Sequence, residues 1–258
     1  SHYANQVDSL SDLYVIDHGS DDGSVENLPT GVNVINLTRD DGYGNYEKWR
    51  VGFAAALCKN LQNEYDAVIY IDCDEYLVVD PFVAQSLNEY FSNKKGVSTH
   101  AIGFDVLHDF KNEPNLLENK ISKVRRNIQF VAAMCKPCVV LNGYNINWGQ
   151  GFHVSNIEPK FGDLYLFHAR YADFDESKQR LKLTRTLFMP ELDKCAVNHQ
   201  KIDDSMLENW LSSWLAFNKS DDDITSKIGG INKYIESFKF NLSSDGIYYY
   251  DYSFRSTL

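Results

Sequence analysis

The chain has 258 residues, of which 43% are hydrophobic, and its 36 acidic and 25 basic residues give a formal net charge of −11. This composition is sufficient for a substantial core, and the acidic balance excludes binding of nucleic acid through non-specific electrostatics. No apolar stretch reaches the length of a membrane span and no signal peptide is visible, so we expect a cytoplasmic protein, with a place at the inner face of the membrane as an alternative.

The first half of the chain alternates segments with strand-like and helix-like patterns. Strands are predicted over Leu13–Ile16 and Val32–Leu37, and a helix over Tyr46–Leu61, where large apolar side chains recur at helical spacing. A further strand begins near Asp66, and a helix follows over about Phe82–Phe91. Alternating strands and helices are typical of a parallel sheet covered by helices.

The pattern changes after about residue 97, where the predicted strands are joined by longer polar loops. We expect residues 1–190 to form one domain and residues 191–258 to form a helical, aromatic-rich extension that packs on it. The strands are expected over Thr99–Leu107, Val124–Val131, Cys138–Leu141 and Leu164–His168, and the helices over Asp175–Leu187 and Asp203–Phe217.

The cysteines do not form a recognisable framework. Five are too few and too scattered for a set of disulfides, and the C-x-x-C at Cys135 and Cys138 lacks the second pair that would complete a zinc site. We therefore expect ordinary half-buried thiols in a reducing compartment.

The most informative segment runs from Asp66 to Leu77, where an apolar run ends in three acids, Asp72, Asp74 and Glu75. A strand can bury the apolar residues but not this much unpaired negative charge, so the acids should lie where the strand leaves the sheet. Ligands of open α/β sheets bind at the carboxyl ends of the strands, and an Asp-x-Asp pair there suits a hard divalent cation. A capped, solvated turn is the alternative that involves no ligand.

A further acid, Asp17, ends another predicted strand and opens a dense run of turn-forming residues. If the two strands are parallel, Asp17 gathers with Asp72 and Asp74 along one edge of the sheet. That edge could take a ribose hydroxyl at Asp17 and a metal–diphosphate at the other two acids, as sugar transfer from a nucleotide donor requires. Taken alone, Asp17 is better explained as a residue that caps its own turn.

Two motifs in this order resemble family 2-like glycosyltransferases of the GT-A fold. The run DHGSDDGS at residues 17–24 is similar to the family's D-x-G-S-x-D-G-[ST] turn, and DCDEYL at residues 72–77 is similar to its D-x-D-E-[FY]-L motif. A trailing segment from His168 to Lys178 completes the set, and the resemblance covers roughly residues 1–185. It implies a Rossmann-like α/β fold with a mixed, mostly parallel sheet flanked by helices.

The resemblance also implies the ligands and their contacts. The donor would be a nucleotide-diphosphate sugar, with a UDP-sugar favoured, the cation Mn²⁺ or Mg²⁺, and the acceptor a glycan or glycolipid. Asp17 would contact the nucleoside, and Asp72 the ribose or the metal. Asp74 would be the main metal ligand and His168 a third ligand, with His153 as a weaker candidate for the same site.

The sequence departs from this family at its beginning. The family starts with a central strand before its first helix, whereas this sequence starts with the short helix that is predicted over His2–Leu10. Either the sequence is a piece of a longer chain, or another segment or a partner fills the place of that strand. A peripheral association with the membrane or with another domain is compatible with both, and no feature of the sequence decides the oligomeric state.

Transfer with inversion, which we expect, needs a base that takes the proton of the acceptor hydroxyl, whereas a retaining enzyme would need no such base. Asp105 and Asp109 are the first candidates, ahead of Glu113 and Asp173. Basic residues near the diphosphate would offset its charge, and the candidates are Lys48 and Arg50 before the acidic strand and Arg170, Lys178 and Arg180 after His168.

Two other functions are open at this level. A phosphatase of the haloacid dehalogenase type also places D-x-D after a buried strand, with the first Asp as nucleophile, but Tyr76 departs from its motif and the Asp17 turn is not part of it. A non-catalytic carbohydrate- or calcium-binding module would use the acids structurally, although Asp22 occupies the position where a calcium loop requires glycine.

Overall fold

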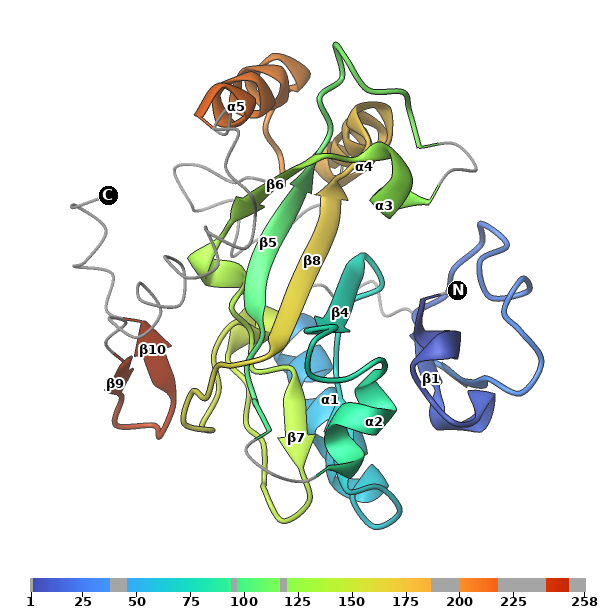
Figure 1. Cartoon of the computed structure of the whole chain (residues 1–258), viewed down its shortest axis with the longest axis vertical. Coiled ribbons are helices and arrows are strands. Elements are labelled where there is room, and N and C mark those ends of the chain that lie inside the picture. Colours follow the sequence, from blue (N-terminus) through green and yellow to red (C-terminus); the bar gives the residue numbers. More distant parts are fainter. Residues whose placement is uncertain are drawn as a thin grey trace.

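The structure is a computed structural model that describes residues 2–37, 46–93, 97–116, 120–186, 200–217 and 240–250. Its largest sheet has the strand order β4-β8-β5-β6, formed by Glu75–Val79, Leu164–Tyr171, Ile102–Leu107 and Asn127–Phe130. The long central strands β5 and β8 run parallel to each other, while β4 and β6 pair antiparallel at the two edges. Figure 1 shows the helices gathered at the two ends of these central strands.

Three two-stranded sheets surround this sheet. β1 (Tyr14–Asp17) pairs parallel with β2 (Asn33–Asn36), and β3 (Ala67–Ile69) pairs antiparallel with β7 (Val139–Leu141). The hairpin of β9 (Phe240–Leu242) and β10 (Tyr248–Tyr250) is the third. In Figure 1 this hairpin and β1 lie on opposite sides of the molecule.

The expectation of one mostly parallel, Rossmann-like sheet is corrected by these pairings. The strand that begins near Asp66 was expected to end at the acids, and β3 does end before Asp72, but a second strand, β4, begins at Glu75 directly after the turn. β3 then pairs with β7 and β4 with β8, so the two strands enter different sheets. The fold is therefore mixed α/β with several small sheets. In the described part of the chain, β1 and β3 belong to different sheets.

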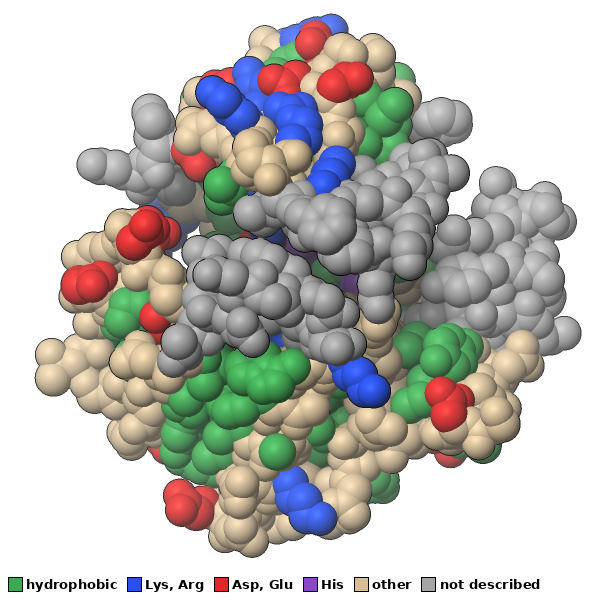
Figure 2. Space-filling view, turned by 180° about the vertical axis from the view of Figure 1, so that it is seen from behind, with side chains coloured by type: hydrophobic (Ala, Val, Ile, Leu, Met, Phe, Trp, Pro, Cys, Tyr) green, Lys and Arg blue, Asp and Glu red, His purple; other side chains and the backbone are tan. Residues whose placement is uncertain are grey.

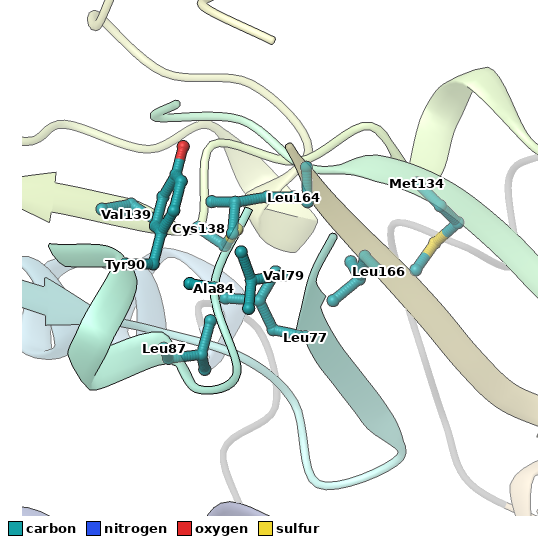
Figure 3. Packing of buried hydrophobic residues seen from close by; sticks show 11 residues of the cluster. Leu77, Val79, Ala84, Leu87, Tyr90, Met134, Cys138, Val139, Leu164 and Leu166 are labelled. Carbon is teal, nitrogen blue, oxygen red and sulfur yellow. The ribbon is translucent and has the colours of Figure 1, made fainter. Parts of the chain in front are cut away.

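The core explains why β4 forms where it does. Its side chains alternate between buried and partly buried, so Leu77 and Val79 enter the main hydrophobic cluster and Glu75 is carried to the same buried face. Leu164 and Leu166 of β8 pack against them, together with Leu87 of α2 (Leu87–Ser92) and several further residues shown in Figure 3. The consequence is a carboxylate, Glu75, whose position is fixed by the apolar pattern of its strand.

The remaining helices cover the ends of the sheets. α1 (Tyr46–Leu61) begins and ends where predicted and packs through Val51, Ala54 and Cys58 against β3 and β7. α4 (Phe174–Thr186) and α5 (Asp204–Phe217) pack together at the far end of β5 and β8, and α3 is the single turn Ile121–Val124.

The expected C-terminal extension is described only in part. α5 lies within it and shares one hydrophobic cluster with the sheet, because Leu207 and Leu211 pack with Leu107 and Leu181. The expected boundary at residues 190 and 191 falls outside the described residues, as does the end of the chain after residue 250. None of the described helices is both long and apolar enough to cross a bilayer.

Candidate functional site

A large cleft, with a volume of about 1820 Å³, brings together most of the charged residues predicted from the sequence. Its polar part is lined by α1, by the turn between β3 and β4, and by residues of β5, β8 and α4. The volume exceeds the roughly 300–1,000 Å³ of ordinary small-molecule sites, so a nucleotide-sized ligand would fill only part of it. Figure 2 shows acidic and basic side chains interspersed on one face of the molecule.

Asp72 lies in this cleft between two cations. Its Oδ1 atom is 3.1 Å from Nη1 of Arg50, and its Oδ2 atom is 3.3 Å from Nζ of Lys136. The guanidinium of Arg50 also stacks over the ring of Phe152, 4.7 Å from its centroid. Asp72 is therefore held by a residue from α1 and by a residue from the loop before β7.

Glu75 and Lys136 form a buried ion pair behind Asp72. The side chain of Glu75 is 1% exposed and that of Lys136 is 6% exposed, and the Lys136 ammonium donates to the Glu75 carboxylate. Burial raises the pKa of Glu75, although Lys136 opposes this. Burial alone would lower the pKa of Lys136, but Glu75 and Asp72 outweigh it and raise that pKa. Charge is retained here because each group compensates the other.

Asp74, the second acid of the Asp-x-Asp pair, contacts residues that follow it by about a hundred positions in the sequence. Its Oδ2 atom is 2.6 Å from Nη1 of Arg180 in α4 and 3.5 Å from Nε2 of His168 in β8. Burial would raise the pKa of Asp74, but His168 and Arg180 together lower it, so the carboxylate is ionised at neutral pH. No described residue forms a hydrogen bond or ion pair with its Oδ1 atom.

His168 links Asp74 to Asp105. The Nδ1 atom of His168 is 2.7 Å from Oδ1 of Asp105, which lies on the neighbouring strand β5 directly opposite His168. Burial alone would lower the pKa of His168, but Asp105 and Asp74 raise it to about 9. In the ligand-free protein His168 is thus a cation between two carboxylates.

The donor atoms here fit a divalent cation that is shared with a substrate. Asp74 and His168 supply one carboxylate oxygen and one imidazole nitrogen on the same side of the cleft, while the carboxylate of Asp72 is directed at Arg50 and Lys136. Among the described residues, no three His, Cys, Asp or Glu side chains are arranged as a complete metal site. Mg²⁺ is commonly held by one or two carboxylates together with substrate phosphates, which matches this incomplete set.

Two of the predicted basic residues, Lys48 and Arg170, also line the cleft. The guanidinium of Arg170 lies over the ring of Tyr171, 5.8 Å from its centroid, and its buried Nη2 atom has no hydrogen-bond partner among the described residues. Lys178 does not line the cleft, since it pairs with Asp175 at 2.6 Å within α4 and lies over the ring of Phe174.

Two predicted acids are used by their own turns. Asp17 accepts hydrogen bonds from the backbone N–H groups of Gly19 and Ser20, and its neighbours Ile16 and His18, rather than Asp17 itself, line the cleft. Asp109 accepts from the N–H of Lys111 and the side chain of Asn112, and it does not line the cleft either. Among the described residues no hydrogen bond or ion pair joins Asp17 to Asp72 or Asp74.

Sequence reasoning missed Lys136 because it looked at the wrong residues of its motif. Cys135 and Cys138 are buried thiols, and burial raises the pKa of each to about 12. The lysine between them, Lys136, is the residue that forms ion pairs with Asp72 and Glu75. The available signal was the buried Glu75, which requires a cation somewhere in the chain.

Comparison of this chain with protein-family models, with curated proteins and with solved structures gives no match.

Proposed function

We propose that this chain is a metal-dependent glycosyltransferase, which moves a sugar from a nucleotide-diphosphate donor to a glycan or glycolipid hydroxyl. The observation that supports this most strongly is the meeting of Asp74 and His168 at 3.5 Å in the cleft that also holds Asp72. These residues belong to two motifs of the resemblance that are far apart in the sequence, and their order alone does not require them to touch.

The pairing of charges also supports a ligand that carries both signs. In the ligand-free protein the acids Asp72 and Asp74 are neutralised by Arg50, Lys136 and Arg180. Asp74 and His168 would gain a cation as partner once the proton on Nε2 of His168 is released to solvent, while the arginines and the lysine would gain phosphate oxygens. The side chains then bind and orient the donor without leaving a buried charge unpaired.

In this proposal Asp74 and His168 hold Mn²⁺ or Mg²⁺, with Asp72 next to them. A cation bound there supplies Lewis-acid stabilisation of the leaving diphosphate. Arg180 and Arg50 hold their positions through α4 and α1, so the cationic groups are preorganised for the charge that develops as the sugar departs.

A thermal-shift screen of nucleotide sugars, each with Mn²⁺ and with chelator, tests the proposal. A donor at about a hundred times its Kd should stabilise the protein by about 2.7 kcal/mol, which corresponds to a rise in Tm of roughly 5–10 °C. The rise should need both components. Stabilisation by metal alone, independent of nucleotide, would support the non-catalytic binding module instead.

The phosphatase alternative is tested in the same preparation. Hydrolysis of p-nitrophenyl phosphate that disappears in Asp72→Asn would support a phosphatase with Asp72 as nucleophile. We expect no such hydrolysis, because the carboxylate of Asp72 is occupied by Arg50 and Lys136.

A further inference from the structure

His153 is held in one tautomer by the backbone. Its Nδ1 atom is 2.6 Å from the carbonyl oxygen of Ala133. A carbonyl oxygen can only accept a hydrogen bond, so Nδ1 must carry the proton. In the neutral ring Nε2 then bears a lone pair, and no described residue donates a hydrogen bond to it.

The surroundings keep this imidazole neutral. Burial, with a contribution from the Lys136 ammonium, lowers the pKa of His153 to about 4. His153 lines the same cleft as Asp72 and His168. With Nδ1 bonded to the Ala133 carbonyl, Nε2 is the unprotonated nitrogen of the neutral ring, whereas the imidazole of His168 is engaged by carboxylates on both sides.

The two acids predicted as catalytic bases are committed elsewhere. Asp105 is 7% exposed and accepts from His168, and Asp109 caps its own turn outside the cleft. A base must be able to reach the proton that it removes. Neither carboxylate has this freedom in the structure, and His153 does.

The backbone before His153 is strained in a way that places the ring. Phe152 has a φ of 60°, which is unusual for a residue with a side chain, and Gly151 has a φ of 71°. Phe152 is 2% exposed and is fixed by the stacked ring of Tyr70 at 4.1 Å. A Cβ atom on Gly151 would lie 2.8 Å from Cδ2 of His153, so the glycine leaves room for the imidazole. Strain of this kind is typical of functional positions.

We infer that His153 is a catalytic residue of the transfer reaction, the group that accepts the proton of the acceptor hydroxyl at Nε2; this rests on the proposed function. As the hydroxyl oxygen forms its bond to the anomeric carbon, its proton passes to Nε2. The bond between that carbon and the phosphate oxygen breaks, and its electron pair leaves with the nucleoside diphosphate. The Nδ1–H group continues to donate its hydrogen bond to the Ala133 carbonyl, and this bond stabilises the positive charge that forms on the ring.

The test compares His153→Asn with the wild-type chain. The asparagine amide can still donate to the Ala133 carbonyl, so the anchoring bond and the fold should persist, but the proton acceptor is lost. With the nucleotide sugar that gives the largest thermal shift, release of nucleoside diphosphate is measured at saturating donor. We expect kcat to fall by about 10²–10⁴-fold, while the Kd of the donor changes by less than about threefold, since His153 contributes no donor contact in this account. An unchanged kcat would overturn the inference.

A second measurement does not depend on turnover. The ¹⁵N resonances of His153, assigned by difference from His153→Asn, report which ring nitrogen carries a proton. We expect a proton on Nδ1 only at pH 7, and a ring protonated at both nitrogens or at Nε2 alone would overturn the inference. Gly151→Ala, which keeps the imidazole but crowds it, should lower kcat in the same direction.

Failure of the proposed function would be recognised separately. It would show as a wild-type chain that binds no nucleotide sugar with or without Mn²⁺. A wild-type chain that binds and turns over donor while His153→Asn does so equally well would leave the proposed function intact and remove only the role of His153.

Discussion

The molecule contains two clusters of paired charges, one partly exposed in the cleft and one buried away from it. One is the cleft cluster of Asp72, Asp74, Lys136 and Arg180. The other joins Arg125 to Glu113 at 3.8 Å and to Asp173 at 3.5 Å, and its residues do not line the cleft. The side chain of Arg125 is 2% exposed, whereas that of Arg180 is 46% exposed.

The difference lies in what the carboxylates bind. Asp173 accepts three backbone N–H groups, and Glu113 accepts those of Asp109 and Arg126. In the described part of the chain no backbone N–H donates to the carboxylate of Asp72 or Asp74, whose partners are all side chains. A carboxylate that accepts hydrogen bonds from backbone N–H groups stabilises the local backbone. A carboxylate that is paired only with side chains can exchange these partners for a ligand.

The largest predicted effect is in the buried cluster of Arg125, Glu113 and Asp173. Arg125→Met leaves Glu113 and Asp173 without their buried cation, and we expect the free energy of unfolding to fall by about 3–5 kcal/mol. Urea denaturation with linear extrapolation measures it. Arg180→Met is the control from the cleft, where an exposed side chain should cost less than about 1 kcal/mol. Equal losses in the two variants would contradict the comparison.

Lys136 is a buried member of the cleft cluster, as Arg125 is of the other cluster, because its side chain is 6% exposed and pairs with the buried Glu75. Lys136→Met leaves the buried Glu75 unpaired and should lower the free energy of unfolding by about 3 kcal/mol. Adding Glu75→Gln removes the uncompensated charge and should recover roughly 1–3 kcal/mol, measured as the coupling in a double-mutant cycle. Additive losses would mean that the two side chains do not stabilise each other.

The pH dependence of the free energy of unfolding also distinguishes the two clusters, with a smaller expected effect. The pKa of His168 is raised from its ordinary value of 6.5 to about 9, so its contribution is complete below pH 6.5 and is lost as pH rises through 9. We expect the free energy of unfolding of the ligand-free protein to fall by about 2–3 kcal/mol over that interval. His168→Gln should remove this dependence, and Arg125→Met should retain it. A wild-type chain without the dependence would contradict the pairing of His168 with Asp74 and Asp105.

Much of the fold could be predicted because local patterns determined it. The helical spacing of Trp49, Phe53 and Leu57 gave α1 its observed bounds, and the end of β1 at Asp17 followed from the turn residues after it. The sheet pairing could not be predicted. β3 and β4 lie on either side of the Asp-x-Asp turn and pair with β7 and β8, which come from distant parts of the sequence.

The site shows the same division. Asp72, Asp74, Asp105 and His168 were named from the sequence and do line one cleft. Their roles depended on contacts that no local pattern encodes, since Asp105 faces His168 only because β5 and β8 pair in that register. Asp17 and Asp109 do not line this cleft. The carboxylate of each accepts hydrogen bonds from backbone N–H groups of its own turn, which is a local pattern.

The central claim is that Asp74 holds a cation that in turn holds a diphosphate, and one measurement tests it directly. The Tm of the wild-type chain, of Asp74→Ala and of the exposed control Asp245→Ala is recorded with Mn²⁺, with a nucleoside diphosphate, and with both. We expect the shift with both ligands to exceed the sum of the separate shifts in the wild-type and Asp245→Ala chains, and to equal that sum in Asp74→Ala. An undiminished excess in Asp74→Ala would contradict the claim.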